Sequence, residues 1–331
     1  MQYTRRDAAT IFGGLALSTT GLMTAGISKA SAQSFATQDV RFVCAFAPGS
    51  GADIIVRYFA EKMRPKLGRT VIVENRAGAG GNIAVEYVAR SKPDGHTVLV
   101  HSGNAIAANM HLYKTPPVDA VRAFQLVATI NRQAYMLTVA ADKPWKNVAE
   151  LTAFLKERGD KASYGTANPP TAVMGEQYKL VTGVKAMQVA YKSGPDALND
   201  TLGGTLDYLM LDPVLALAQA RENKLRILAV STKERISAVP DIPSMHESGV
   251  TGMDILGWWS AQVPAATPRP IVDQLGQMFS EVVASPEAKE FLNKVGGDPY
   301  VNSPDAAQKI LVDDVKNWGD YVRLAKIEPQ G

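Results

Sequence analysis

The residues of this chain best suited to chemistry are the eight from Phe46 to Asp53, Phe-Ala-Pro-Gly-Ser-Gly-Ala-Asp. An apolar run over 40–46 leads into them and apolar residues at helical spacing follow over 55–63, which predicts strand, glycine-rich loop and helix. Such a loop lets a ligand approach the backbone, and the helix directs unpaired N–H groups and a positive dipole end toward one point. The predicted chemistry is capture of a small anion by main-chain groups. The candidate contacts are Phe46, Gly49, Ser50, Gly51, Ala52 and Asp53.

Asp53 has two alternative roles, because an acidic residue at a helix start can face a ligand or cap its own backbone. A second glycine-rich loop, Gly78 to Ile83, begins like a dinucleotide fingerprint, but Ile83 stands where the third glycine is needed. The chain also has no G-x-x-x-x-G-K-[ST] nucleotide loop, so we expect no cofactor. Both loops could instead be tight turns that only the topology requires. Further candidate contacts are Ala79 and Gly80 in this loop and Asn104 beyond it.

A third loop, Thr166 to Pro170, separates an expected strand at 161–165 from an expected helix at 171–182. Its two prolines remove two N–H donors, so side-chain hydroxyl and amide groups are expected to contribute instead. The candidate contacts here are Thr166, Ala167, Asn168, Thr171 and Ser193. Asp212, which ends an expected strand at 206–211, is a candidate selectivity residue for a ligand that carries an amine.

Two similar passages of alternating strands and helices have to position these loops. The first has strands at 40–46, 70–74 and 96–101, with helices at 53–64 and 82–90. A crossover strand at 134–140 and a helix at 147–158 lead to the second, with strands at 161–165, 185–191, 206–211 and 225–231. This alternation predicts an α/β fold with two mainly parallel sheets, each flanked by helices. Ligands bind at the carboxyl ends of such strands, so we expect a ligand between the two sheets.

The N-terminus has the features of an export signal. Thr4-Arg5-Arg6-Asp7 precedes an uncharged run from Ala8 to Ser28, and a small-residue cleavage site ends at Ala32. We predict a signal peptide over residues 1–32, cleavage after Ala32 and a periplasmic protein. The paired arginines suit a twin-arginine signal, and the alternatives are general secretion or an uncleaved transmembrane helix.

Composition excludes several classes of partner. Removing residues 1–32 takes Arg5, Arg6 and Lys29 from the 35 basic residues and Asp7 from the 32 acidic ones, which leaves a net charge of +1. This balance gives no reason to expect nucleic acid or a membrane surface as a partner. The single cysteine, Cys44, is expected to be a buried apolar residue of the first strand. The four histidines lack metal-ligand spacing, so no metal site is expected.

Several motifs follow one another in the order of a known family. They are Pro48-Gly49-Ser50 with Asp53 and Arg57, Val73 to Ile83, Pro93-Asp94-Gly95, Tyr191-Lys192, Leu202-Gly203-Gly204, Lys224 to Val230, Pro240 to Ser244 and Pro264-Ala265. In these motifs the chain resembles the Bug family of extracytoplasmic solute receptors, related to the substrate-binding component of tripartite tricarboxylate transporters. The resemblance implies a two-lobed type II periplasmic-binding-protein fold joined by crossover strands. Lobe 1 would take residues 34–138 and 257–331, including helices at 268–283, 286–295 and 304–325, and lobe 2 residues 139–256.

The resemblance also implies a function. It describes a periplasmic solute-binding protein, not an enzyme, that holds a small carboxylate in the interlobe cleft mainly through backbone amides. The ligand would pass to the integral membrane subunits of a tripartite tricarboxylate-type transporter or to a sensor, and we expect a monomer. The alternative is an exported α/β enzyme acting on a small anionic substrate, although the chain has no G-x-S-x-G elbow.

The chain departs from the family pattern at Ser50, Ala77 and Ser193, and most of all over residues 165–171, where the family usually has S-x-G-x-G-[ST]. With fewer N–H donors in that loop, a second carboxylate would lose its hydration without adequate compensation. We therefore predict a monocarboxylate with a neutral polar or aromatic far end rather than a citrate-like tricarboxylate.

Overall fold

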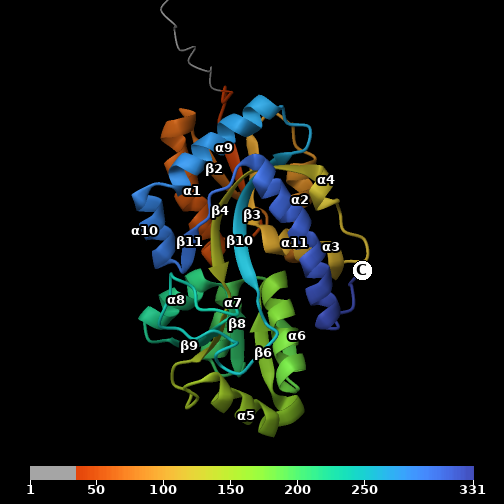
Figure 1. Ribbon diagram of the computed structural model, residues 1–331, viewed down its shortest axis with the longest axis vertical. Helices are drawn as coiled ribbons and strands as arrows, with labels where there is room; N and C mark the ends of the chain where they lie inside the picture. The colour runs from red at the N-terminus through yellow and green to blue at the C-terminus, as the bar shows by residue number, and fades with distance from the viewer. Residues whose placement is uncertain (1–34) are drawn as a thin grey trace, which may run out of the picture. The chain divides into compact units, whose positions relative to one another are not determined.

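The computed structural model of the protein describes residues 35–331 (Figure 1). The expected signal peptide and its cleavage after Ala32 lie outside the described residues. Over the described range, no helix has the length and apolar character needed to cross a membrane. Strands and helices alternate along this part of the chain, and the strands form two sheets.

The first sheet has six strands in the order β11-β4-β10-β3-β1-β2 within the described residues. The strands are β1 (Val40–Cys44), β2 (Val71–Asn75), β3 (Thr97–Ser102), β4 (Phe124–Ala134), β10 (Leu256–Pro264) and β11 (Gly297–Pro299). β1 pairs in parallel with β2 and β3, whereas β10 lies antiparallel between β3 and β4.

Helices cover both faces of this sheet, because successive residues of a strand point to opposite faces. Phe42 of β1 packs against α1 (Gly51–Leu67) and α9 (Arg269–Val283), with its ring centroid 5.6 Å from that of Phe279. Its neighbour Val43 belongs to the core on the other face. That core is formed with α2 (Asn82–Ala89), α3 (Gly103–Leu112) and α11 (Pro304–Leu324), and the remaining helices of this region are α4 (Ala120–Ala123), α10 (Pro286–Lys294) and the 3₁₀ turn η1 (Ala79–Gly81).

The second sheet has five described strands in the order β7-β6-β8-β5-β9. They are β5 (Met136–Ala140), β6 (Ser163–Thr166), β7 (Met187–Ala190), β8 (Tyr208–Leu211) and β9 (Leu225–Val230). On one face, the rings of Tyr164 and Tyr208 stack at 5.1 Å in a buried cluster. The helices of this sheet are α5 (Val148–Arg158), α6 (Pro169–Thr182), α7 (Gly194–Leu202) and α8 (Pro213–Arg221), with the 3₁₀ turn η2 (Gly159–Lys161) after α5.

Two crossover segments connect the sheets. We call the six-stranded sheet with its helices the first lobe, and the five-stranded sheet with its helices the second lobe. One crossover segment passes from β4 through Tyr135 to β5, and the other leaves β9 at Ser231 and returns into β10. The buried Ser231 joins the two segments: Tyr135 N donates to its hydroxyl at 2.9 Å, and that hydroxyl donates to Ile255 O at 2.6 Å. The helix α11 also contacts both lobes, because its Trp318 is buried in the same cluster as Tyr164 (Figure 1).

Most strands of each sheet run in one direction, as expected, and the exceptions have a clear cause. β5 and β10 enter their sheets from the other lobe and therefore run against their neighbours, as does the short edge strand β11. The sequence interpretation included neither α3 nor β4. The proposed lobe division at 138/139 falls inside β5, so residues 136–138 pair in the second sheet, and the division itself remains a prediction.

Candidate functional site

Two adjoining cavities lie between the lobes. An inner cavity of about 40 Å³ is enclosed by residues of both lobes, and an outer cavity of about 500 Å³ lies beside it. Phe46, Ala167 and Asn168 line both cavities. The two cavities are therefore neighbouring parts of one cleft.

Four of the helices that begin at the inner cavity are each capped by a side chain that lines it. The caps are Ser50 of α1, Ser102 of α3, Asn168 of α6 and Asp212 of α8, which accept from the N–H groups of Asp53, Ala105, Thr171 and Leu215. The positive ends of four helix dipoles thus converge on one small volume. Such an arrangement favours an anion.

The first turn of α1 offers two amides to this volume. The N–H of Asp53 binds the Ser50 hydroxyl and that of Ile54 binds Ser50 O. The N–H groups of Gly51 and Ala52 have no acceptor among the described residues, and Ala52 lines the inner cavity. These unpaired donors are the groups that a carboxylate would bind.

The start of α6 offers no such donors. Pro169 and Pro170 lack N–H groups, the N–H of Thr171 binds the Asn168 side chain at 3.0 Å, and that of Ala172 binds Asn168 O. The first turn of α6 therefore presents side chains rather than amides, whereas the N–H groups of Ala167 and Gly194, which also line the inner cavity, have no acceptor among the described residues.

Asp53 fixes the shape of the first loop. Its carboxylate accepts from Gly49 N at 3.0 Å, Arg57 Nε at 2.8 Å and Asn75 Nδ2 at 2.8 Å. Burial alone would raise the pKa of Asp53, but the hydrogen bonds from Arg57, Gly49 and Asn75 outweigh it and hold that pKa below its usual value. Asp53 lines neither cavity, so of its two alternative roles the geometry favours the structural one.

Some of the expected site residues lie along the cleft. Those lining the cavities are Phe46, Ser50, Ala52, Ala79, Gly80, Thr166, Ala167, Asn168 and Asp212. Gly51 adjoins the inner cavity, since Oδ1 of Asp212 lies 2.1 Å from the position that a Cβ on Gly51 would occupy. Burial raises the pKa of Asp212, although N–H groups at the start of α8 oppose that shift.

Four other expected contacts do not line either cavity, and each is engaged elsewhere. Gly49 is exposed, and its N–H is bonded to Asp53. Thr171 is buried in the capping box of α6, and Ser193 caps α7 through the N–H of Asp196. Asn104 accepts from Trp258 N at 2.6 Å and donates to Leu256 O at 3.0 Å, so it fastens the start of β10.

Several cleft residues were missed. Ser102 ends β3 and caps α3 as Ser50 caps α1, each before a glycine, so the same serine–glycine pattern at a helix start could have identified it. Tyr135 and Trp259 line the inner cavity from the crossover strands, where nothing in the sequence marks them. The outer cavity adds the side chains of Asn109, Tyr113, Gln188 and Tyr191.

The fully buried His101 lies behind Phe46, with ring centroids 5.2 Å apart. Neither of its ring nitrogens has a hydrogen-bond partner within residues 35–331. Burial lowers its pKa to about 3, so the ring is neutral at physiological pH. In the same part of the chain, no group of three or more His, Cys, Asp or Glu side chains is placed to hold a metal ion.

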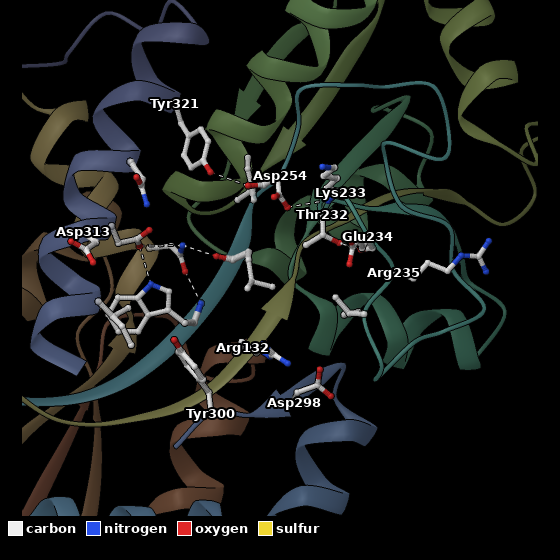
Figure 2. Close-up of a pocket in the computed structure, with 18 of the residues that line it drawn as sticks. Arg132, Thr232, Lys233, Glu234, Arg235, Asp254, Asp298, Tyr300, Asp313 and Tyr321 are labelled. Atoms are coloured by element: carbon white, nitrogen blue, oxygen red, sulfur yellow. Dashed lines mark hydrogen bonds between the residues drawn. The ribbon is translucent and has the colours of Figure 1, made fainter. Parts of the chain in front are cut away.

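A larger cavity of about 820 Å³ lies beside the crossover segments (Figure 2). It shares no lining residue with the cleft cavities, and acidic side chains outnumber basic ones along it. They are Glu234, Asp254, Asp298, Asp313 and Asp314 against Arg132, Lys233 and Arg235. Because this charge disfavours an anion, we place the candidate anion site in the cleft.

Comparisons with known proteins agree with this geometry. A family model described as tripartite tricarboxylate transporter family receptor matches residues 55–326. A UPF0065 protein of Bordetella bronchiseptica is 30% identical over 311 residues, covering 93% of this chain and 92% of the relative. The solved structure of R. palustris Rpa4515 with adipate has a TM-score of 0.85 and 27% identity, covering 89% of this chain and 99% of that chain. The periplasmic binding protein BugD has a TM-score of 0.84 and 30% identity, covering 89% and 99%.

These similarities extend over both lobes and both crossover segments. They confirm the expected two-lobed periplasmic-binding-protein fold and the expected relationship to Bug proteins. With a family model over most of its length and relatives of matching extent, the chain belongs to the tripartite tricarboxylate transporter receptor family.

Proposed function

We propose that this protein is a periplasmic receptor that captures a small carboxylate in the cleft between its lobes and delivers it to a membrane transporter. The observation that carries the proposal is the pair of unpaired amides, Gly51 and Ala52, at the start of α1 beside the inner cavity. A carboxylate that accepted both N–H groups would also interact favourably with the helix dipole. A relative with the same fold has been solved with adipate, which supports a carboxylate as ligand.

The second lobe narrows the ligand class. Because α6 begins with two prolines and its next two amides are already bonded, a second carboxylate would find no free amide in the first turn of α6. We infer that the ligand has one carboxylate and a neutral polar or aromatic far end. A ligand amine next to the carboxylate would find a partner in Asp212.

The same proposal includes the export of the protein to the periplasm and the membrane proteins that receive its ligand. The mature chain would begin at Gln33 after cleavage following Ala32, by the twin-arginine or the general route. Either the integral membrane subunits of a tripartite tricarboxylate-type transporter or a sensor would receive the ligand from a monomeric receptor. The ligand would be released unchanged, so incubation with the protein should leave a bound carboxylate chemically intact.

A proline substitution tests the amides directly. Ala52→Pro removes one N–H at the second position of α1, where proline is tolerated because no intrahelical bond is lost. We expect carboxylate affinity to fall about 10- to 100-fold, the effect of losing one charge-assisted hydrogen bond of roughly 1.5–3 kcal/mol. Calorimetric titration with adipate and with monocarboxylates provides the measurement.

Ala149→Pro is the matched control, because Ala149 is the second residue of α5, is exposed and lies outside both cavities. It should keep the affinity of the unaltered protein. Equal affinity in a folded Ala52→Pro protein would mean that the carboxylate does not bind at the start of α1.

A further inference from the structure

The C-terminal tail, which we define as residues 327–331, forms part of the wall of the outer cavity. The helix α11 ends at Leu324, and the tail follows it after two further residues. Ile327 and Gln330 of the tail line the outer cavity, and neither lines the inner one. In Figure 1 the end of the chain, marked C, lies beside α3. The last residues of the chain therefore bound the candidate ligand site.

The end of α11 fixes where the tail begins. Lys326 has a positive φ of 53°, which turns the chain back on the helix. The N–H of Lys326 donates to Arg323 O at 3.1 Å, and that of Ile327 donates to Val322 O at 3.2 Å. Two such bonds define the Schellman motif, in which the apolar residue after the turn packs against the last turn of the helix. Ile327 accordingly packs against the buried cluster that contains Val322 and, from the second lobe, Met174.

The other end of the tail is fastened to the first lobe. Gln330 forms a parallel bridge with Tyr113, the residue that follows α3. Its N–H donates to Leu112 O at 2.8 Å, and its carbonyl accepts from Lys114 N at 2.9 Å. Leu112 and Tyr113 also line the outer cavity. The tail is thus held at both ends, by α11 and by the end of α3.

The helix α3 separates the tail from the inner cavity. Its cap Ser102 lines the inner cavity, and Leu112 at its other end lines the outer one. An α-helix rises about 1.5 Å per residue, so α3 spans roughly 15 Å. A ligand that starts in the inner cavity therefore extends along α3 before it reaches the tail.

We propose that the C-terminal tail sets the greatest length of ligand that the cleft accepts, and that the far end of the ligand meets Ile327. This inference rests on the proposed function, because it assumes that the carboxylate lies in the inner cavity at the start of α1. Each methylene group that enters the outer cavity adds apolar burial, so affinity should first rise with length. A ligand that is too long would have to displace a segment held at both ends, so affinity should then fall.

Two homologous series of acids test the tail by calorimetric titration. They are the straight-chain monocarboxylates from butanoate to decanoate and the α,ω-dicarboxylates of the same lengths. Ile327→Ala should move the optimum to a longer acid, and the acid one carbon beyond the original optimum should gain about tenfold in affinity. Ile327→Phe should move the optimum to a shorter acid.

Leu324→Ala is the matched control for the change in side-chain volume. Leu324 is the last residue of α11, is 57% exposed and lines neither cavity, so the optimum should stay where it is in the unaltered protein.

A second pair of variants acts on the fastening of the tail. Gln330→Pro removes the N–H that binds Leu112 O, so the tail should yield and acids beyond the original optimum should bind more tightly. Gln330→Ala removes the side chain but keeps both backbone bonds, and it should leave the optimum unchanged.

The outcomes separate this inference from the proposed function. An optimum that stays at one length in Ile327→Ala, Ile327→Phe and Gln330→Pro would overturn the role of the tail. So would an equal loss of affinity for every length, which indicates that the tail only supports the fold, or an affinity in the unaltered protein that rises through the longest acid. In these cases acids bind and the proposed function stands. If no acid of either series binds the unaltered protein, the proposed function fails, and the role of the tail fails with it.

Discussion

Oδ1 of Asp212 in the second lobe lies 2.1 Å from the position that a Cβ on Gly51 in the first lobe would occupy. The starts of α1 and α8 can meet only because residue 51 has no side chain. Two residues further along α8, Val214 is buried in the core cluster of the first lobe. The lobes are therefore in contact beside the inner cavity.

We predict that Gly51→Ala holds the lobes apart. The added methyl group would overlap Asp212 and would lie 2.8 Å from Cβ of Val214, so the contact between α1 and α8 cannot form unchanged. Small-angle scattering of the unaltered protein should give a smaller radius of gyration with saturating carboxylate. The variant should show a larger radius under the same conditions and an unfolding midpoint close to that of the unaltered protein. An equally small radius in the variant would show that this contact does not limit closure.

Asp212 should make the binding of simple acids depend on pH. Burial raises its pKa, and its ionised form would repel a ligand carboxylate in the same cavity. Butanoate affinity should therefore be higher at a pH below the raised pKa of Asp212 than at pH 8. Asp212→Asn should bind butanoate about tenfold more tightly at pH 8, an effect of roughly 1.4 kcal/mol, with little pH dependence.

The same substitution should weaken the binding of 2-aminobutanoate, whose ammonium group next to the carboxylate would lose its partner. Asp196→Asn, at the start of α7 and outside both cavities, is the control and should change neither acid. An Asp212→Asn protein with unaltered affinity for both acids at both pH values would remove Asp212 from the account of selectivity.

His101 should reduce stability in acid. Its pKa falls from 6.5 to about 3 on burial, so below pH 6.5 the unfolded chain binds a proton that the folded protein excludes. This residue should lower the free energy of unfolding progressively from pH 6.5 toward pH 3, by up to about 5 kcal/mol. His101→Leu should lose that part of the pH dependence in urea unfolding measured between pH 4 and 7. Identical pH profiles for the two proteins would contradict a neutral buried ring.

Asp314 should change the free energy of unfolding with pH in the direction opposite to His101. Burial raises its pKa from 3.8 to about 6, although the indole N–H groups of Trp258 and Trp318 lower it in part. Between those two values the folded protein holds a proton that the unfolded chain has lost. The free energy of unfolding should therefore fall as the pH rises from about 4 to 6, by about 3 kcal/mol in total. Asp314→Asn, tested by urea unfolding, should lack this fall, and a variant that follows the unaltered profile would disprove the shift.

The first loop and the paired sheets could be predicted from the sequence because they depend on local patterns. Glycine, serine and proline between an apolar run and an amphipathic run define the start of α1, and the same reasoning predicted the helix α6, although the role of Asn168 as its cap was not predicted. The roles of Asp53 and Gly49 could not be assigned, because whether a cap faces its own loop or a ligand depends on Arg57 and Asn75, which approach from elsewhere.

The residues that the crossover strands contribute to the cleft could not be predicted from the sequence. Tyr135 and Trp259 enter the cleft because their strands connect the lobes, and their positions depend on pairings between distant segments. Asn104 was expected at the ligand and instead fastens β10, since its partners Leu256 and Trp258 are about 150 residues away in sequence. Pairings at such separation leave no local signal.

The central claim, that the cleft binds a small carboxylate at the start of α1, is tested most directly by calorimetric titration of residues 33–331 with mono-, di- and tricarboxylates. The account predicts one binding site per chain, with a monocarboxylate as the tightest ligand and citrate much weaker. Citrate or another tricarboxylate binding at least tenfold more tightly than every monocarboxylate would contradict the assigned ligand class. Absence of binding by every carboxylate would contradict the central claim itself.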